Sequence, residues 1–298
     1  MPPSGSPKTA FVLAGGGSLG AVQVGMLKAL SRLHVVPDLI VGASVGAINA
    51  AYFAADPSDE GLARLERIWR RLRRPDIFPF SPINSVLAML GKRDHLVATS
   101  LLRSLIESEL PCQRLQDVRI PCHVVATDVL DGTEVALEAG PVADALLASA
   151  AIPAVFPPVS IDGRHLMDGG VANNTPISTA IKLGAARIVV LPTGMSCALT
   201  APPRGAVALA LHALNLLIMR QLLSDIDHFG ERAELIVLPP LCPLAVTAYD
   251  FSHTAELIHR AEASTRLWLK THGLHGHGAP ATLMPHQHEH EAHGRDAL

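Results

Sequence analysis

The stretches TAFVLAGGGSLGAVQVGMLKAL (9–30) and LIVGASVGAINAAYFAA (39–55) repeat one arrangement near the N-terminus. Each begins with a short apolar run, passes through a turn of small residues, and continues with apolar residues at helical spacing. Two strand–turn–helix units in succession predict an α/β fold with a mainly parallel sheet and crossover helices. Further strands are expected at 122–127, 133–137, 188–191 and 235–238, with a short hairpin around 162–163, and helices at 60–73, 100–109, 141–151, 205–223 and 252–270.

The composition is that of one globular domain. The chain has 298 residues, of which 49% are hydrophobic and 17% charged, and a net charge of −3, which excludes a disordered chain and gives no basic surface for nucleic acid. We expect a disordered N-terminus at 1–8, a domain at 9–270 with an irregular cap at 75–98, and a disordered tail at 271–298. Seven of the 15 histidines fall in that tail, but no metal site is predicted, because the pattern has no fixed geometry.

The expected location of the protein in the cell rests on its cysteines and on one apolar, uncharged run near residue 210. Four widely spaced cysteines without a CxxC pair favour reduced thiols and a cytoplasmic protein. The uncharged run at 205–219 is shorter than the roughly 20 apolar residues of a membrane-spanning helix. We therefore expect a buried or surface-lying helix there, with peripheral membrane contact left as an option.

The second glycine turn, Gly42-Ala43-Ser44-Val45-Gly46, fits the G-x-S-x-G nucleophile elbow. In such an elbow the serine lies on a cramped strand-to-helix turn, so its neighbours two residues away must lack bulk. The apolar run before it and the helical pattern after it supply the expected context. An alternative interpretation is a glycine-flanked turn whose serine merely begins a helix.

The first glycine turn, Gly15-Gly16-Gly17-Ser18-Leu19-Gly20, matches two patterns. As G-x-G-x-x-G it is similar to a dinucleotide-binding loop, but the acidic residue expected at the end of the second strand is missing. As a run of main-chain N–H groups before a helix, it would hold an anion. Beside a serine nucleophile, that anion is the oxyanion of acyl transfer.

A serine nucleophile needs a base, and Asp168 in LMDGG (166–170) is the candidate. An α/β-hydrolase would place its nucleophile after the fifth strand, whereas Ser44 follows the second expected strand. The two glycines Gly169 and Gly170 after Asp168 allow close approach of another loop. A plain Asp-Gly turn explains the same residues.

Together these motifs resemble the patatin-like phospholipase family. The resemblance is carried by four blocks in the family's order, namely GGGSLG (15–20), GASVG (42–46), ASAAIPAVFPPV (148–159) and DGGVANNTP (168–176). It implies a three-layer α/β/α fold and a Ser–Asp dyad without histidine. Carried over, Ser44 is the nucleophile, Asp168 is its base, and Gly15, Gly16 and Gly17 form the oxyanion loop. The other motif glycines are Gly20, Gly42, Gly46, Gly169 and Gly170.

The resemblance implies a carboxylic ester hydrolase that acts on lipid acyl chains without a cofactor. Ser44 would form an acyl-enzyme on a phospholipid or a neutral acyl ester, and water activated by Asp168 would release the fatty acid. The sequence departs from the family at Leu19, where the family has Arg or Lys. The missing charge leaves neutral esters open as substrates and predicts no strong preference for anionic head groups.

Two alternatives remain from the sequence. A catalytically silent lipid-binding or membrane-scaffold protein could have the same fold, and an esterase could use a Ser–Asp–His triad. Asn173 and Asn174 are candidates for orienting the Asp168 loop, although they are also ordinary turn residues. The hydrophobic residues of the cap fit either a lipid-entry and membrane-docking surface or packing onto the domain, namely Ile77, Phe78, Phe80, Val86, Leu87, Met89 and Leu90.

Overall fold

One sheet of eight strands forms the centre of the molecule in the part of the chain that the structure describes. The structure is a computed structural model that describes residues 7–78, 97–194, 197–199, 201–276 and 278–284. The strands are β1 (Thr9–Leu13), β2 (Leu39–Ala43), β3 (Cys122–Asp128), β4 (Glu134–Leu137), β5 (Val159–Ile161), β6 (Arg164–Asp168), β7 (Arg187–Leu191) and β8 (Glu234–Val237).

The sheet is parallel at its core and antiparallel at one side. Its order is β5-β6-β3-β2-β1-β7-β8, with β4 paired to β3. The neighbours from β3 through β2, β1 and β7 to β8 are parallel, while β4, β5 and β6 join by antiparallel pairing. The mainly parallel sheet predicted from the repeated strand–turn–helix units is confirmed.

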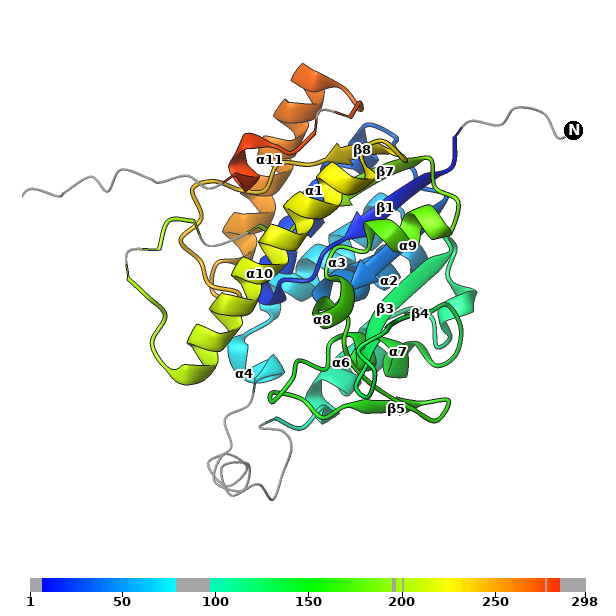
Figure 1. The fold of residues 1–298 in the computed structure, drawn as a ribbon, viewed down its shortest axis with the longest axis vertical. Coiled ribbons are helices and arrows are strands. Elements are labelled where there is room, and N and C mark those ends of the chain that lie inside the picture. Colours follow the sequence, from blue (N-terminus) through cyan, green and yellow to red (C-terminus); the bar gives the residue numbers. More distant parts are fainter. Residues whose placement is uncertain (1–6, 79–96, 195–196, 200, 277, 285–298) are drawn as a thin grey trace, which may run out of the picture.

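Helices cover both faces of this sheet, which gives the three layers implied by the family resemblance (Figure 1). On β1, Phe11 and Leu13 face one helical layer while Ala10 and Val12 face the other, because successive side chains of a strand alternate. The first layer contains α1 (Gly20–Arg32), α2 (Val45–Ala55), α3 (Asp59–Arg71), α6 (Ser100–Glu109), α7 (Val142–Ser149) and α11 (Thr254–His272). The second contains α9 (Ile177–Lys182) and α10 (Ala206–Phe229).

Two short α-helices lie next to the ends of α3 and β6. They are α4 (Arg74–Ile77), at the start of the predicted cap, and α8 (Gly170–Asn173), directly after β6. The sequence did not predict α8. It predicted Thr175 as a helix cap with Pro176 as the first helical residue, and this was wrong, since Pro176 is the cap of α9 and the Thr175 hydroxyl is buried without a hydrogen bond.

The predicted ends of the domain are shifted in the structure. Lys8 already belongs to the fold, since its carbonyl accepts hydrogen bonds from the N–H groups of Ala186 and Arg187. The chain after 270 also packs on the domain as far as it is described, because Leu283 is 2% exposed in the second helical layer. The boundary at 270 was therefore too early, since an apolar residue within a polar segment found a place in the core. Residues 79–96 of the cap and 285–298 of the tail lie outside the described residues.

Candidate active site

The central strand β3 brings the two candidate catalytic residues together. Its Val125 pairs with Ala43 at the end of β2, and the next residue, Ala126, pairs with Asp168 at the end of β6. Ser44 follows Ala43 directly, so residues 124 positions apart in the sequence meet at one point of the sheet. The Ser44 hydroxyl donates a hydrogen bond of 2.6 Å to Oδ2 of Asp168.

Ser44 adopts the strained backbone of a nucleophile elbow. Its φ of 53° and ψ of −128° are unusual for a residue with a side chain, and such strain is retained where surrounding contacts hold it. Here the Ser44 N–H donates to Oγ of Ser149 at 2.8 Å, and that hydroxyl donates to the carbonyl of Val125 at 2.6 Å. Ser149 is thus a positioning residue that sequence reasoning missed, although it lies in the block ASAAIPAVFPPV.

Asp168 is held in a position that favours proton acceptance. It is 7% exposed, and within the described part of the chain its carboxylate accepts hydrogen bonds from the Ser44 hydroxyl at Oδ2 and from the N–H of Gly170 at Oδ1, 2.7 Å away. Burial raises the pKa of Asp168 to about 6, against the lowering effect of these two hydrogen bonds. The side chain is therefore a stronger base than a solvated aspartate and is still ionised at neutral pH.

The glycine loop supplies two free donors rather than three. The N–H groups of Gly16 and Gly17 have no hydrogen-bond partner within the described residues, and both glycines line the same pocket as Ser44. The Gly15 N–H, in contrast, donates to the carbonyl of Asn174 at 3.1 Å. Within the expected oxyanion loop, Gly15 therefore anchors the loop to the rest of the site, and Gly16 and Gly17 are the candidate donors.

Contacts from distant segments fix the glycine loop in place. The carbonyl of Gly15 accepts hydrogen bonds from the Thr193 hydroxyl at 2.8 Å and from the Asn174 side chain at 3.4 Å. Ser18 donates its N–H to the carbonyl of Ala248 and its hydroxyl to that of Thr247. Leu19 is 1% exposed and packs in the hydrophobic core, so its side chain is directed away from the pocket.

The remaining motif residues support this arrangement. Asn174 lines the pocket beside the glycine loop, whereas the Asn173 side chain donates to Glu134 on β4 at 2.6 Å. Among the motif glycines, Gly170 donates its N–H to the carboxylate of Asp168. The other four lie on elements around the site, with Gly20 beginning α1, Gly42 in β2, Gly46 in the first turn of α2, and Gly169 between β6 and α8.

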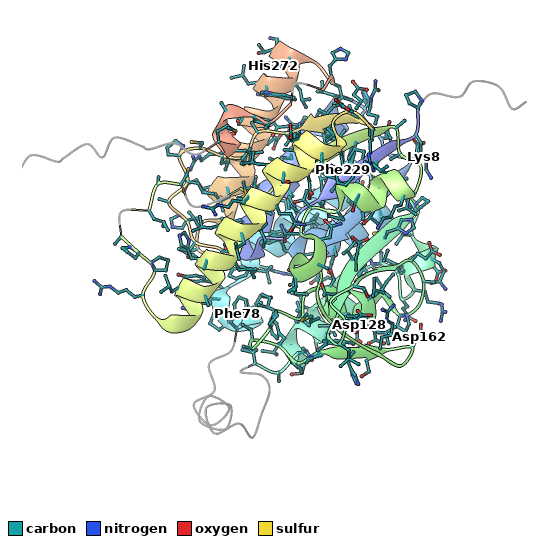
Figure 2. All side chains as sticks on the ribbon, viewed as in Figure 1. Lys8, Phe78, Asp128, Asp162, Phe229 and His272 are labelled. Atoms are coloured by element: carbon teal, nitrogen blue, oxygen red, sulfur yellow. The ribbon has the colours of Figure 1, made fainter. Side chains whose placement is uncertain are left out.

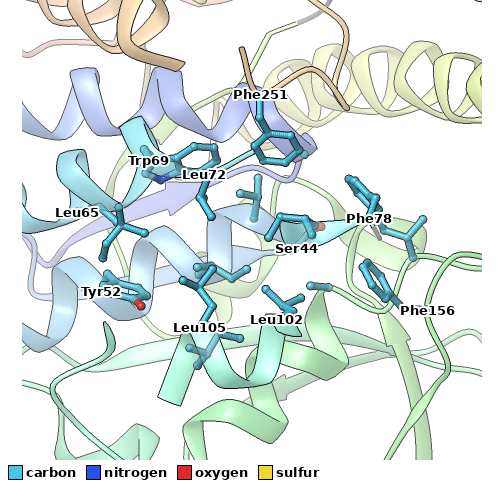
Figure 3. Close-up of a pocket in the computed structure, with 18 residues that line it drawn as sticks. Ser44, Tyr52, Leu65, Trp69, Leu72, Phe78, Leu102, Leu105, Phe156 and Phe251 are labelled. Atoms are coloured by element: carbon cyan, nitrogen blue, oxygen red, sulfur yellow. The ribbon is translucent and has the colours of Figure 1, made fainter. Parts of the chain in front are cut away.

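An apolar cavity begins at Ser44 and extends along α2 (Figure 3). It encloses about 720 Å³ of empty space, including its open part, and none of the described residues that line it is charged. Figure 3 shows Ser44 between an aromatic group at one side, with Phe78 and Phe156, and the residues Tyr52 and Leu65 at the other. Ile77 and Phe78 from the predicted cap line this cavity, while the other cap hydrophobes lie outside the described residues.

A second pocket forms the polar side of the site. It includes Ser44, Asp168 and the glycine loop, and it is bounded by Leu214 and Ile218 of α10 and by Tyr249. Among the described residues that line either pocket, Asp168 is the only charged one and none is a histidine, lysine or arginine. Within the described ranges, no cluster of three or more His, Cys, Asp or Glu side chains offers a metal site.

Comparison with known proteins places the chain in a family. The family model described as patatin-like phospholipase matches residues 11–181, which is more than half of the chain and includes both Ser44 and Asp168. The chain belongs to the patatin-like phospholipase family. The family predicted from the four sequence blocks is confirmed, and the match to the family model ends within α9, before α10 begins.

Relatives of this patatin-like chain are distant and mostly longer. It is 28% identical over 187 residues to patatin-like phospholipase domain-containing protein 7 of Rattus norvegicus, covering 62% of this chain and 13% of the relative. It is 31% identical over 179 residues to an uncharacterized NTE family protein of Mycobacterium tuberculosis, covering 59% of this chain and 46% of the relative. The chain thus matches less than half the length of either protein.

A solved structure shows the same fold at low identity. Human GIVD cytosolic phospholipase A2 superposes with a TM-score of 0.51 at 11% identity, covering 89% of this chain and 59% of that one. At this identity the likeness concerns the fold, and the three-layer arrangement predicted for the patatin-like chain agrees with it.

Proposed function

We propose that the protein is a serine hydrolase of lipid acyl esters that uses Ser44 and Asp168 as a catalytic dyad. The observation that carries the proposal is the 2.6 Å hydrogen bond from the Ser44 hydroxyl to a buried carboxylate at the end of an apolar cavity. Membership of the patatin-like phospholipase family supports lipid hydrolysis as the general activity.

The reaction proceeds in two steps. In the first, Ser44 Oγ attacks the ester carbonyl carbon while its proton passes to Asp168, and the N–H groups of Gly16 and Gly17 bind the resulting oxyanion. Collapse of this intermediate breaks the ester bond, and the leaving alcohol takes the proton from Asp168. In the second step a water molecule gives its proton to Asp168 and attacks the acyl-enzyme, and collapse returns the proton to Ser44 as the fatty acid leaves.

The lining of the site supports an uncharged or zwitterionic ester as substrate. The cavity beside Ser44 is apolar and fits an acyl chain, while the pocket around Asp168 has neutral polar side chains such as Asn174 and Asn215. No described lining residue offers a cation to a phosphate, and Leu19 lies in the core. The proposal therefore does not require an anionic head group.

A fluorophosphonate probe tests the dyad. The probe phosphorus is attacked by an activated serine and remains bound to it, so the wild-type chain is expected to label and Ser44→Ala is not. Ser160→Ala, which removes an exposed hydroxyl on β5, is the matched control and is expected to label as wild type does. No labelling of the wild-type chain would favour the silent lipid-binding alternative, and loss of labelling on substitution of a single histidine would favour the triad.

The cavity also sets an expected acyl-chain length. Val45, Ile48 and Tyr52 line it from one face of α2, and eight residues of helix separate Ser44 from Tyr52 by about 12 Å. An extended acyl chain of comparable length would fit along this face of α2. Tyr52, which is 8% exposed, forms the far end together with Leu65.

Shortening Tyr52 is expected to lengthen the preferred acyl chain. Tyr52→Ala opens space at that end, so the optimum over a series of nitrophenyl esters is expected to move toward longer chains. The chain's other tyrosine, Tyr249, lies at the polar pocket, and Tyr249→Ala is expected to leave the optimum chain length in place. Equal optima for wild type and Tyr52→Ala would show that the acyl chain lies elsewhere.

A further inference from the structure

Helix α10 has an outward face that changes character along its length. Its first half exposes large apolar side chains, with Leu209 at 53%, Leu216 at 43% and Leu217 at 62% exposure. The second half exposes polar residues instead, namely Arg220, Gln221, Ser224, Asp227 and His228. A solvated helix normally turns polar residues outward along its whole length, so the first half is unusual.

The apolar half of α10 lies at the mouth of the candidate active site. Leu214 and Ile218 line the pocket that contains Ser44 and Asp168. Leu217 lies three residues after Leu214 and is therefore its neighbour on the helix surface. Figure 2 shows Phe78, another lining residue of that pocket, near the end of α10 opposite to Phe229.

The inner face of α10 keeps the helix on the protein. Met219, Leu222 and Ile226 are buried against the second face of the sheet. By length and composition alone, the part Ala208–Phe229 meets the criteria for crossing a membrane, but these packed residues hold it along the domain surface. A helix in this situation lies on a lipid layer rather than through it.

We infer that the outward face of the first half of α10, defined by Leu209, Leu216 and Leu217, docks on a lipid surface. The inference rests on the proposed function, since it explains how an insoluble acyl ester reaches Ser44. The last exposed leucine of this face, Leu217, is next to Ile218, the last residue of α10 that lines the pocket. The run 205–219 has no charged residue, and Arg204 and Arg220 flank it. Arginines at the rim of an apolar face suit the head-group layer.

Docking in this orientation opens the pocket toward the lipid. An acyl chain could then pass from the layer between Leu214 and Val171 to Ser44 without crossing water. Val171 of α8 is 42% exposed on the same pocket, so the apolar rim continues from α10 to α8. A partner protein or a second copy would instead cover the mouth and exclude substrate.

Vesicle flotation of the full chain tests the docking face. All variants carry Ser44→Ala so that the vesicles are not hydrolysed, and the vesicles consist of phosphatidylcholine alone or with added phosphatidylglycerol. Leu216→Ser with Leu217→Ser is expected to lower the vesicle-bound fraction, with a partition constant reduced roughly tenfold or more. Leu267→Ser is the matched control, because Leu267 is 67% exposed on α11, in the other helical layer, and its partition is expected to be unchanged.

Three outcomes would overturn the inference. They are equal partition of the double variant and its parent, no binding of the parent to either vesicle, and a parent that is dimeric in solution and becomes monomeric in the double variant. The double variant in a chain with intact Ser44 should still hydrolyse a short, water-soluble nitrophenyl ester at the wild-type rate. If the protein does not bind vesicles but hydrolyses the soluble ester, the docking inference fails and the proposed function stands. If it hydrolyses no ester, the proposed function fails, and flotation still measures docking independently.

Discussion

Asp168→Asn is expected to abolish most of the hydrolase activity while making the folded protein more stable. The asparagine can keep a hydrogen bond to Ser44 and accept one from Gly170, but it cannot take the proton of the attacking hydroxyl. Loss of a general base lowers kcat by roughly 10²- to 10⁴-fold. Ester hydrolysis at pH 8 measures this loss.

The gain in stability follows from the raised pKa of the same carboxyl. Its folded pKa of about 6 lies above the ordinary value of 3.8 for an aspartate, so ionised Asp168 destabilises the folded state above pH 6. Removing the charge is expected to raise the free energy of unfolding at neutral pH by up to about 3 kcal/mol. The difference should shrink as the pH falls from 6 toward 4 and vanish below it, because the carboxyl is then protonated in both states.

Two further measurements separate this account from a general effect of removing an aspartate. Asp128→Asn is the matched control, since the Arg164 guanidinium lowers the pKa of Asp128, and that variant should gain no stability at neutral pH. In the wild type, kcat/KM should rise with pH through about 6 and level off above it, as the base ionises. A lower melting temperature for Asp168→Asn than for the wild type at neutral pH would contradict the conclusion that burial of the ionised carboxylate destabilises the folded protein.

Gly46→Ala is expected to destabilise the whole domain. Gly46 lies in the first turn of α2, where that helix crosses the end of β1, and an added Cβ would lie against the carbonyl of Leu13 and 2.6 Å from that of Ala14. Both are main-chain atoms of the strand and its turn, so relief requires moving α2 away from the sheet. We expect a loss of about 3 kcal/mol, or roughly 6–12 °C in Tm.

Chemical denaturation of Gly46→Ala beside Gly230→Ala measures this effect. Gly230 is exposed at the end of α10 with helical backbone angles (φ −58°, ψ −24°), so its substitution should be close to neutral. Because α2 carries Ser44 at its start, the activity of Gly46→Ala should fall as well. Equal midpoints for the two variants would mean that α2 does not lie as close to β1 as the structure has it.

The alternation of short apolar runs, glycine turns and helical patterns was sufficient to predict a mainly parallel sheet with crossover helices. The reason is local, since side chains of a buried strand alternate between two faces and small residues allow a strand to turn directly into a helix. The same requirement for small residues at a strand-to-helix turn identified Ser44 as the candidate nucleophile. The end of the domain was harder to place, because the burial of Leu283 depends on contacts with distant strands and not on its polar neighbours.

The sequence by itself determined the family and both candidate catalytic side chains, because the glycine and serine motifs reflect steric demands at fixed spacing. Asp168 needed the family pattern, since an Asp-Gly pair alone describes any turn. Only the tertiary structure decided that β3 joins the two residues, that Gly16 and Gly17 rather than Gly15 have free donors, and that Ser149 holds the elbow. It also decided which leucines of α10 face outward, because hydrogen bonding and exposure depend on partners from segments far apart in the chain.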